Sequence, residues 1–195
     1  MVQPERKPEE HYTYKDLRSW PEGERWELID GVPYDMTPAP GVPHQRISRR
    51  LERQIDGYLA GSPCEMFHAP VDVFLPEGQE AEDEIDTLVQ PDIFVVCDQA
   101  KVTDDGIKGA PDLVVEILSP STAQKDLTLK FRVYERAGVR EYWVVHPVDH
   151  TLMVFRLTEN GQYGRPDSYG ETDEVPVGVL DGLTIELQRV FAGEE

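Results

Sequence analysis

Two acidic residues interrupt stretches of this sequence that are otherwise apolar, and they are the first candidates for chemistry. Glu116 stands in the middle of DLVVEILSPST, at 112–122, an apolar run typical of a strand buried on both faces. Burying an ionised carboxylate costs several kcal/mol unless a cation, a metal ion or a shifted pKa compensates. Asp92 interrupts a second apolar run, VQPDIFVV, directly after a proline. Because paired strands lie about 4.8 Å apart, we expect the two carboxylates to converge at one edge of a sheet.

With the backbone carbonyl of Ile117 and water, these two carboxylates form a ligand set that suits Mg²⁺ or Mn²⁺. Asp112 lies on the same strand as Glu116, but at about 3.3 Å per residue their Cα atoms are roughly 13 Å apart, so we expect Asp112 only to begin the strand. Each acid also has an ordinary structural explanation. Pro-Asp is a common turn dipeptide, and a strand glutamate can simply pair with a basic residue.

A lysine after this strand is the third candidate. AQKDLTLKFRVYERAGV, at 123–139, predicts a helix that ends at Gly138. Its inward face is expected to contain Leu127, Phe131 and Tyr134. Lys130 is flanked by these residues, so its stem can lie along apolar surface while its ammonium points toward the sheet. There it would stabilise negative charge that develops on a phosphate. An ordinary i,i+4 ion pair with Asp126 is the alternative.

The segments upstream of these residues predict a short helix, a hairpin and a longer helix. TYKDLRSW, at 13–20, carries a capping-box pattern, and RWELIDGVPYDM, at 25–36, predicts a hairpin that turns at Asp30-Gly31. PHQRISRRLERQIDGYLAG, at 43–61, has apolar residues at helical spacing and arginines on the other face. The residues expected on its inward face are His44, Ile47, Leu51, Ile55 and Tyr58.

Strands are expected between and after these helices. They are predicted at about 64–75, 88–97, 111–118, 141–147 and 151–157, with weaker strands up to about 190. This order predicts an α/β or α+β fold with a mixed sheet flanked by helices. At 195 residues we expect a single domain with a core at about 24–147, C-terminal strands at 151–190 and a flexible start at 1–12.

The formal net charge of −19 argues against a protein that coats nucleic acid electrostatically, because such proteins present a basic surface. The acidic residues are unevenly distributed, however. Residues 77–86 hold six acids and no base, whereas HQRISRRLERQIDGYLA, at 44–60, holds four arginines and two acids. A local surface for a polyanion is therefore compatible with the sequence. No apolar run approaches the ~18 residues of a membrane span, so no membrane association is expected.

Cys64 and Cys97 are far apart in the sequence and belong to no metal-binding or CxxC pattern. We expect two free, buried thiols in a reducing cytoplasm. The polar start of the chain has no apolar segment of the kind found in secretory signals, which also predicts a cytoplasmic location.

The motifs QPD, PDLVVEILSPST and GVREYWVVHP, with D…K…Y between them and WELIDG and HQ upstream, resemble the Uma2 (DUF820) endonuclease family of the PD-(D/E)XK nuclease-like superfamily. The similarity runs from about Trp26 to Pro147, and TYKDLRSWPEG also fits it. The resemblance implies a restriction endonuclease-like fold, in which a mixed sheet has a helix on each side. The combined pattern is specific, whereas any one of its pieces is weak.

The resemblance also implies roles for individual residues. Asp92 matches the aspartate of PD and Glu116 matches the acidic residue of (D/E)XK. The superfamily lysine should stand two residues later, where this chain has Leu118, and Lys130 on the following helix takes its place. Glu27 and His44 match the upstream pattern. For Glu27 the alternative is a hairpin carboxylate paired with an arginine, and for His44 it is a hydrogen-bonded core histidine rather than a group that contacts phosphate or orients water.

We therefore expect an enzyme, a Mg²⁺- or Mn²⁺-dependent endonuclease that hydrolyses phosphodiester bonds in DNA, with Asp92, Glu116 and Ile117 as metal ligands and Lys130 beside them. One alternative is a catalytically inactive nuclease-fold module for binding or assembly, which the charge and the missing in-strand lysine suggest. Another is a metal-dependent hydrolase of a small phosphorylated metabolite. The expected partners are DNA, a second copy of this chain in a homodimer, and a basic protein that contributes to DNA binding.

Overall fold

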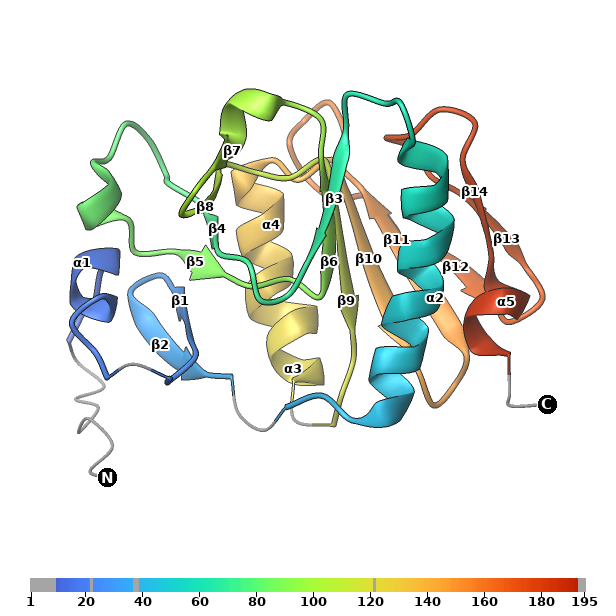
Figure 1. The fold of residues 1–195 in the computed structure, drawn as a ribbon, viewed down its shortest axis with the longest axis horizontal. Helices are drawn as coiled ribbons and strands as arrows, with labels where there is room; N and C mark the ends of the chain where they lie inside the picture. The colour runs from blue at the N-terminus through green and yellow to red at the C-terminus, as the bar shows by residue number, and fades with distance from the viewer. Residues whose placement is uncertain (1–9, 22, 37–38, 121, 193–195) are drawn as a thin grey trace.

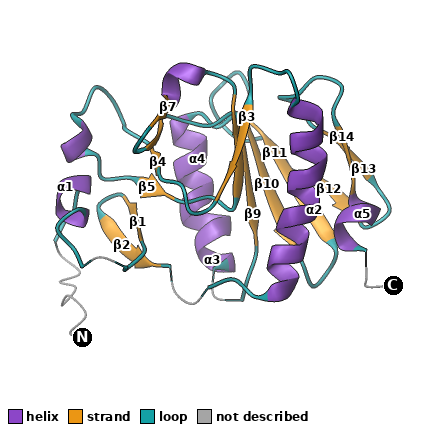
Figure 2. Ribbon diagram, viewed as in Figure 1, coloured by secondary structure: helices purple, strands orange, loops and turns teal. Residues whose placement is uncertain are grey.

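The computed structural model describes residues 10–21, 23–36, 39–120 and 122–192, which form two six-stranded sheets and a separate two-stranded hairpin (Figures 1 and 2). The central sheet has the strand order β12-β11-β10-β9-β6-β3. Its strands are β3 (Glu65–His68), β6 (Ile93–Val96), β9 (Leu113–Ile117), β10 (Glu141–His146), β11 (Thr151–Arg156) and β12 (Asp167–Gly170). β9 and β10 are parallel, and the other four neighbouring pairs are antiparallel.

The second six-stranded sheet, here the N-terminal sheet, has the order β2-β1-β5-β4-β8-β7. Its strands are β1 (Trp26–Ile29), β2 (Val32–Asp35), β4 (Val73–Phe74), β5 (Leu88–Val89), β7 (Val102–Thr103) and β8 (Gly106–Lys108). β4 and β8 are parallel, so this sheet is mixed as well. The hairpin consists of β13 (Glu174–Pro176) and β14 (Thr184–Glu186).

Helices cover both faces of the central sheet, which stands between α2 and α4 in Figure 1. The α-helices are α1 (Tyr14–Leu17), α2 (Val42–Leu59), α3 (Ala123–Lys125), α4 (Phe131–Ala137) and α5 (Leu187–Phe191). A π-helical turn, η3 (Asp126–Lys130), joins α3 to α4, and two 3₁₀ turns are η1 (Glu82–Glu84) and η2 (Gln99–Lys101).

The two covered faces explain the apolar run in β9. Leu113, Val115 and Ile117 pack in one buried cluster with the inward face of α2. Val114 packs in the other cluster, with Val133 and Tyr134 of α4. A strand covered on both sides needs apolar residues at successive positions. Because side chains alternate along a strand, Glu116 shares the α4 side with Val114.

Most predicted elements are confirmed. The capping box of α1 is present, with the Thr13 backbone N–H donating to Asp16 Oδ2 at 2.9 Å. The hairpin β1–β2 turns at Asp30 and Gly31, which have φ of 50° and 71°. The helix after β9 ends at Gly138, which is left-handed with φ of 88°.

Two residues expected on inward helix faces are exposed. Tyr58 is 43% exposed. It lies in the last turn of α2, and its hydroxyl donates a hydrogen bond to the backbone carbonyl of Asp181. Leu127 is 37% exposed, because the π-helical turn directs Asp126 and Lys130 inward instead. The predicted α-helical period is therefore wrong within this turn, and a wider turn replaces it.

The expectation of two free thiols is wrong, because Cys64 and Cys97 form a disulfide. β3 and β6 are antiparallel, with Glu65 opposite Val96, and the same register places the cysteines opposite one another one step further along. Their sequence separation of 33 concealed this cross-strand pairing.

The ends of the chain differ in part from expectation. The C-terminal strands were predicted up to about 190, but the last strand ends at Glu186, and Leu187–Phe191 form α5, a helix that the sequence reading missed. The predicted flexibility of residues 1–12 falls mainly on residues 1–9, which lie outside the described residues; Tyr12 is held by a 2.9 Å hydrogen bond from its N–H to the Gly31 carbonyl. No helix within the described ranges is long and apolar enough to cross a membrane.

Candidate active site

Asp92, the residue directly before β6, and Glu116 of β9 lie next to each other at one end of the strands of the central sheet. Ile93 of β6 is opposite Val115 of β9, and the same register, carried one residue further, puts Asp92 opposite Glu116. Asp92 Oδ2 accepts a 2.8 Å hydrogen bond from the backbone N–H of Ile117. Asp92, Glu116 and Ile117 all line one pocket of about 540 Å³.

Glu116 is buried, with 3% of its surface exposed, and two donors engage one of its oxygens. Lys130 Nζ lies 2.9 Å and Tyr134 Oη 2.7 Å from Glu116 Oε1. Burial raises the pKa of Glu116 to about 8, since the Lys130 ammonium offsets burial only in part and the carboxylates of Asp126 and Asp92 raise this pKa further. The site therefore holds more buried negative charge than its lysines neutralise.

Lys130 joins Glu116 to a second buried acid, Glu27, which comes from β1 of the N-terminal sheet. Lys130 Nζ lies 2.7 Å from Glu27 Oε1 and 3.9 Å from Asp126 Oδ1. Burial alone would lower the pKa of Lys130, but the surrounding carboxylates outweigh burial and hold this pKa well above its ordinary value. Both expected contacts of Lys130 are therefore present, the one toward the sheet and the i,i+4 pair.

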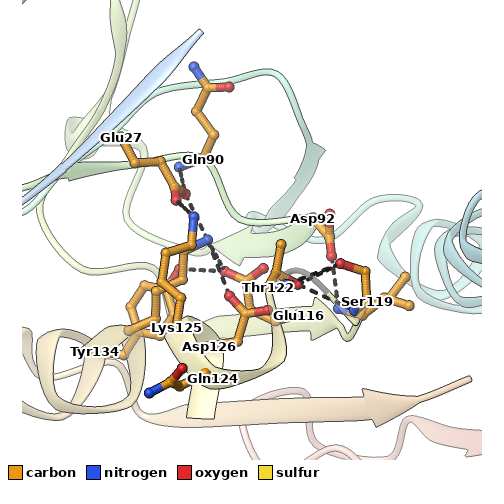
Figure 3. Close-up of polar contacts among 12 residues, drawn as sticks. Glu27, Gln90, Asp92, Glu116, Ser119, Thr122, Gln124, Lys125, Asp126 and Tyr134 are labelled. Carbon is orange, nitrogen blue, oxygen red and sulfur yellow. Dashed lines mark hydrogen bonds and ion pairs between the residues drawn. The ribbon is translucent and has the colours of Figure 1, made fainter. Parts of the chain in front are cut away.

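Glu27 is completely buried and is bound by lysines rather than by an arginine. Lys125 Nζ lies 2.5 Å from Glu27 Oε2, and the backbone N–H of Gln90 donates to Glu27 Oε1 at 3.0 Å. Burial would raise the pKa of Glu27, but the ammonium groups of Lys130 and Lys125 outweigh it, so this pKa lies below the ordinary value. Figure 3 shows Glu27, Lys125 and Glu116 grouped around these contacts.

The sequence reading gave no role to Lys125 or Gln90. Lys125 and Lys130 are five residues apart, a separation that places two side chains on different faces of an α-helix but on one side of a π-helical turn. The side chain of Gln90, part of the QPD motif, donates to Asp72 Oδ1 at 2.7 Å and accepts from Arg25 at 2.7 Å. The QPD motif is the sequence signal from which a role for Gln90 could have been predicted.

His44, in the first turn of α2, approaches Asp92 from the other side. Its Nε2 lies 3.1 Å from Asp92 Oδ2, and both side chains are largely buried, 13% and 19% exposed. Burial would lower the pKa of His44, but the hydrogen bond to Asp92 and its negative charge outweigh burial and raise this pKa. His44 is thus hydrogen-bonded, as a core histidine would be, and also lines the pocket.

The donor set fits a hard divalent cation that keeps part of its water shell. Among the described residues no group of three or more His, Cys, Asp or Glu side chains could enclose a metal ion. Asp92 and Glu116 line the pocket together, and the hydrogen bonds described above engage only Oδ2 of the first and Oε1 of the second. Two carboxylates completed by a carbonyl and water are a common arrangement for Mg²⁺.

Leu118 occupies the position where the superfamily pattern has its lysine. Its side chain is 9% exposed and packs in the apolar cluster on the α4 side. The ammonium of Lys130 reaches Glu116 from the helix instead.

Comparisons with known proteins identify the family and the fold. The Uma2 family model, described as "Putative restriction endonuclease", matches residues 13–188. A relative from Synechocystis sp. named "Uncharacterized protein slr1290" is 27% identical over 191 residues, which cover 97% of this chain and 93% of the relative. A crystal structure described as a "putative nuclease belonging to DUF820" from Anabaena variabilis superposes with a TM-score of 0.73 at 20% identity, covering 92% of this chain and 97% of the other. The predicted restriction endonuclease-like fold class is confirmed by this match.

Proposed function

The chain belongs to the Uma2 family, and from this premise we propose that it is a divalent-metal-dependent nuclease that hydrolyses phosphodiester bonds in DNA. The observation that carries the proposal is the position of Asp92 opposite Glu116 at one pocket wall, with the buried Lys130 bonded to Glu116. Asp92, Glu116 and the carbonyl of Ile117 would hold Mg²⁺ or Mn²⁺. A bound cation supplies Lewis-acid chemistry, because it polarises a phosphoryl oxygen and makes a coordinated water more acidic.

The side chains around the ligands have separable roles. His44 fixes Asp92 through Nε2, and the backbone N–H of Ile117 holds the same carboxylate from the strand. Lys130 is 3% exposed and surrounded by acids, so we assign it to holding Glu116 and Glu27 in position.

Lys125 is the cation that we assign to the phosphate. It lines the pocket, and 15% of its side chain is exposed, compared with 3% for Lys130. An ammonium at the pocket wall stabilises the negative charge that develops on a phosphoryl oxygen in the transition state. Lys125→Met should lower the cleavage rate even under conditions in which the variant is fully folded. Lys125→Arg should restore part of the rate.

The proposal is tested with purified protein, supercoiled plasmid DNA and Mg²⁺, Mn²⁺ or EDTA, with nicked and linear DNA measured on gels. The wild type should cleave only with the divalent ion, and Asp92→Asn or Glu116→Gln should lower the rate on the order of 100-fold or more. Asp112→Asn is the matched control, because Asp112 also follows a proline at a strand start but bonds to Cys97 and Arg140, outside the pocket. It should cleave like the wild type.

Two outcomes contradict the proposal. One is an absence of divalent-dependent cleavage by the wild type, and the other is undiminished cleavage by Asp92→Asn. Parallel assays on single-stranded RNA and on bis(4-nitrophenyl) phosphate separate the alternatives. Turnover of the small ester alone favours a metabolite hydrolase, and metal binding without any turnover favours an inactive module.

A further inference from the structure

The outward face of α2 carries a basic stripe on an acidic chain. Arg46, Arg49, Arg50 and Arg53 are spaced i, i+3, i+4 and i+7, so they share one helix face, here called the arginine face. This face is opposite to the residues of α2 that pack on the central sheet. With a formal net charge of −19, most of the surface repels polyanions, so a basic stripe is a distinctive local feature.

Most basic residues elsewhere are neutralised by acids. Ion pairs within the described ranges engage, for example, Lys108, Arg136, Arg140, Arg156 and Arg189. Arg49 and Arg53 are exposed, and no carboxylate of the described residues lies within ion-pair distance of either. Their charge is therefore available to a ligand.

A hollow connects the arginine face to the candidate active site. It has a volume of about 690 Å³ and lies between α2 and the turn after β3. Arg46, Arg49 and His68 line it, and it extends to His44 and Asp92, which also line the catalytic pocket. Glu52 is a second acid on its wall besides Asp92, and this carboxylate accepts a 2.6 Å hydrogen bond from Ser48. The hollow leads from basic side chains to the ligands proposed for the metal.

We infer that the arginine face and this hollow bind the phosphodiester backbone of duplex DNA and guide one strand to Asp92 and Glu116. The inference rests on the proposed nuclease function. Arg53 lies seven residues after Arg46, about 10 Å along the helix, a length that matches about three base-pair steps along the axis of a duplex. Contacts of this kind hold the backbone without reading sequence, and they explain how an acidic protein can engage DNA through one face.

The test compares two double variants with equal charge change. Arg49→Ala/Arg53→Ala removes charge from the arginine face. Arg132→Ala/Arg165→Ala removes the same charge from exposed positions outside α2, one on α4 and one between β11 and β12, and neither of these arginines forms a described ion pair. Binding to a short labelled duplex is measured by fluorescence anisotropy in EDTA over a series of salt concentrations. We expect the first variant to bind on the order of tenfold more weakly and to lower the slope of log K against log salt by about 2, because two phosphate contacts are lost. The second variant should bind like the wild type.

Three outcomes would overturn the inference: both variants bind as tightly as the wild type, both lose the same affinity, or the wild type fails to bind DNA at low salt. The cleavage assay keeps it separate from the proposed function. If DNA binding depends on Arg49 and Arg53 but no metal-dependent cleavage is found, the inferred DNA-binding surface is supported and the nuclease proposal is contradicted. If Arg49→Ala/Arg53→Ala cleaves DNA with an unchanged KM, the nuclease proposal is supported and the inferred DNA-binding surface is contradicted.

Discussion

Replacing Glu116 with glutamine should change how the stability of the protein depends on pH. The ordinary pKa of this carboxyl is 4.5 and burial raises it to about 8 in the folded protein. Between these values the folded state binds one proton more than the unfolded state, so the free energy of unfolding falls as pH rises, by about 1.4 kcal/mol per unit. From about pH 5.5 to about pH 8 the loss amounts to about 3 kcal/mol.

Glutamine cannot titrate, but its Oε1 still accepts hydrogen bonds from Lys130 and Tyr134, which both bond to that oxygen in Glu116. The free energy of unfolding of the wild type and of Glu116→Gln is therefore measured by urea titration at several pH values in this range. Other groups with shifted pKa values, such as Asp126 and His44, are present in both proteins. The difference between the two curves isolates Glu116, and it should move by about 3 kcal/mol in favour of the variant as pH rises.

Parallel curves for the two proteins would refute this reasoning, because they would mean that Glu116 is ionised in the folded state throughout the range. A pKa lowered by Lys130 rather than raised by burial would give such parallel curves, because Glu116 would then be ionised in both the folded and the unfolded state throughout this range.

Three further results are expected in urea unfolding experiments near neutral pH. Lys130→Met should lower the free energy of unfolding by about 3–5 kcal/mol, because it leaves buried carboxylates without their shared cation, and a change below about 1 kcal/mol would contradict this role. Tyr134→Phe should cost about 1.5–3 kcal/mol through loss of a hydrogen bond to a buried acid, with no change in the overall circular dichroism spectrum. Cys64→Ser/Cys97→Ser should cost about 3–4 kcal/mol, because the disulfide closes a loop with a sequence separation of 33, and wild-type protein in reducing agent should show the same loss.

The pairing of Asp92 with Glu116 could be predicted because it depends on short-range rules. Each acid interrupts an apolar strand, and neighbouring strands bring such interruptions together at a sheet edge. The hairpin at Asp30-Gly31 and the helix end at Gly138 followed from local backbone preferences in the same way.

The remaining features depend on contacts that local patterns do not encode. The contact of Lys125 with Glu27 depends on a π-helical turn, which a prediction based on 3.6 residues per turn cannot anticipate. Glu27 could be placed near the site only by its family pattern, because its strand belongs to a different sheet from Glu116. The pairing of Cys64 with Cys97 follows from the register of β3 and β6, which the sequence pattern left open.

The ammonium of Lys130 links the two six-stranded sheets, because it pairs with Glu27 of the N-terminal sheet and with Glu116 of the central sheet. Under the proposed function, relatives that had lost catalysis would still lose stability if one of these three residues were replaced, because a buried charge would be left unpaired. In a comparison of homologues, retention of Glu27, Lys130 and Glu116 thus reports an intact scaffold. If the proposed function holds, retention of the more accessible Asp92 and His44 would be the better marker of an active enzyme.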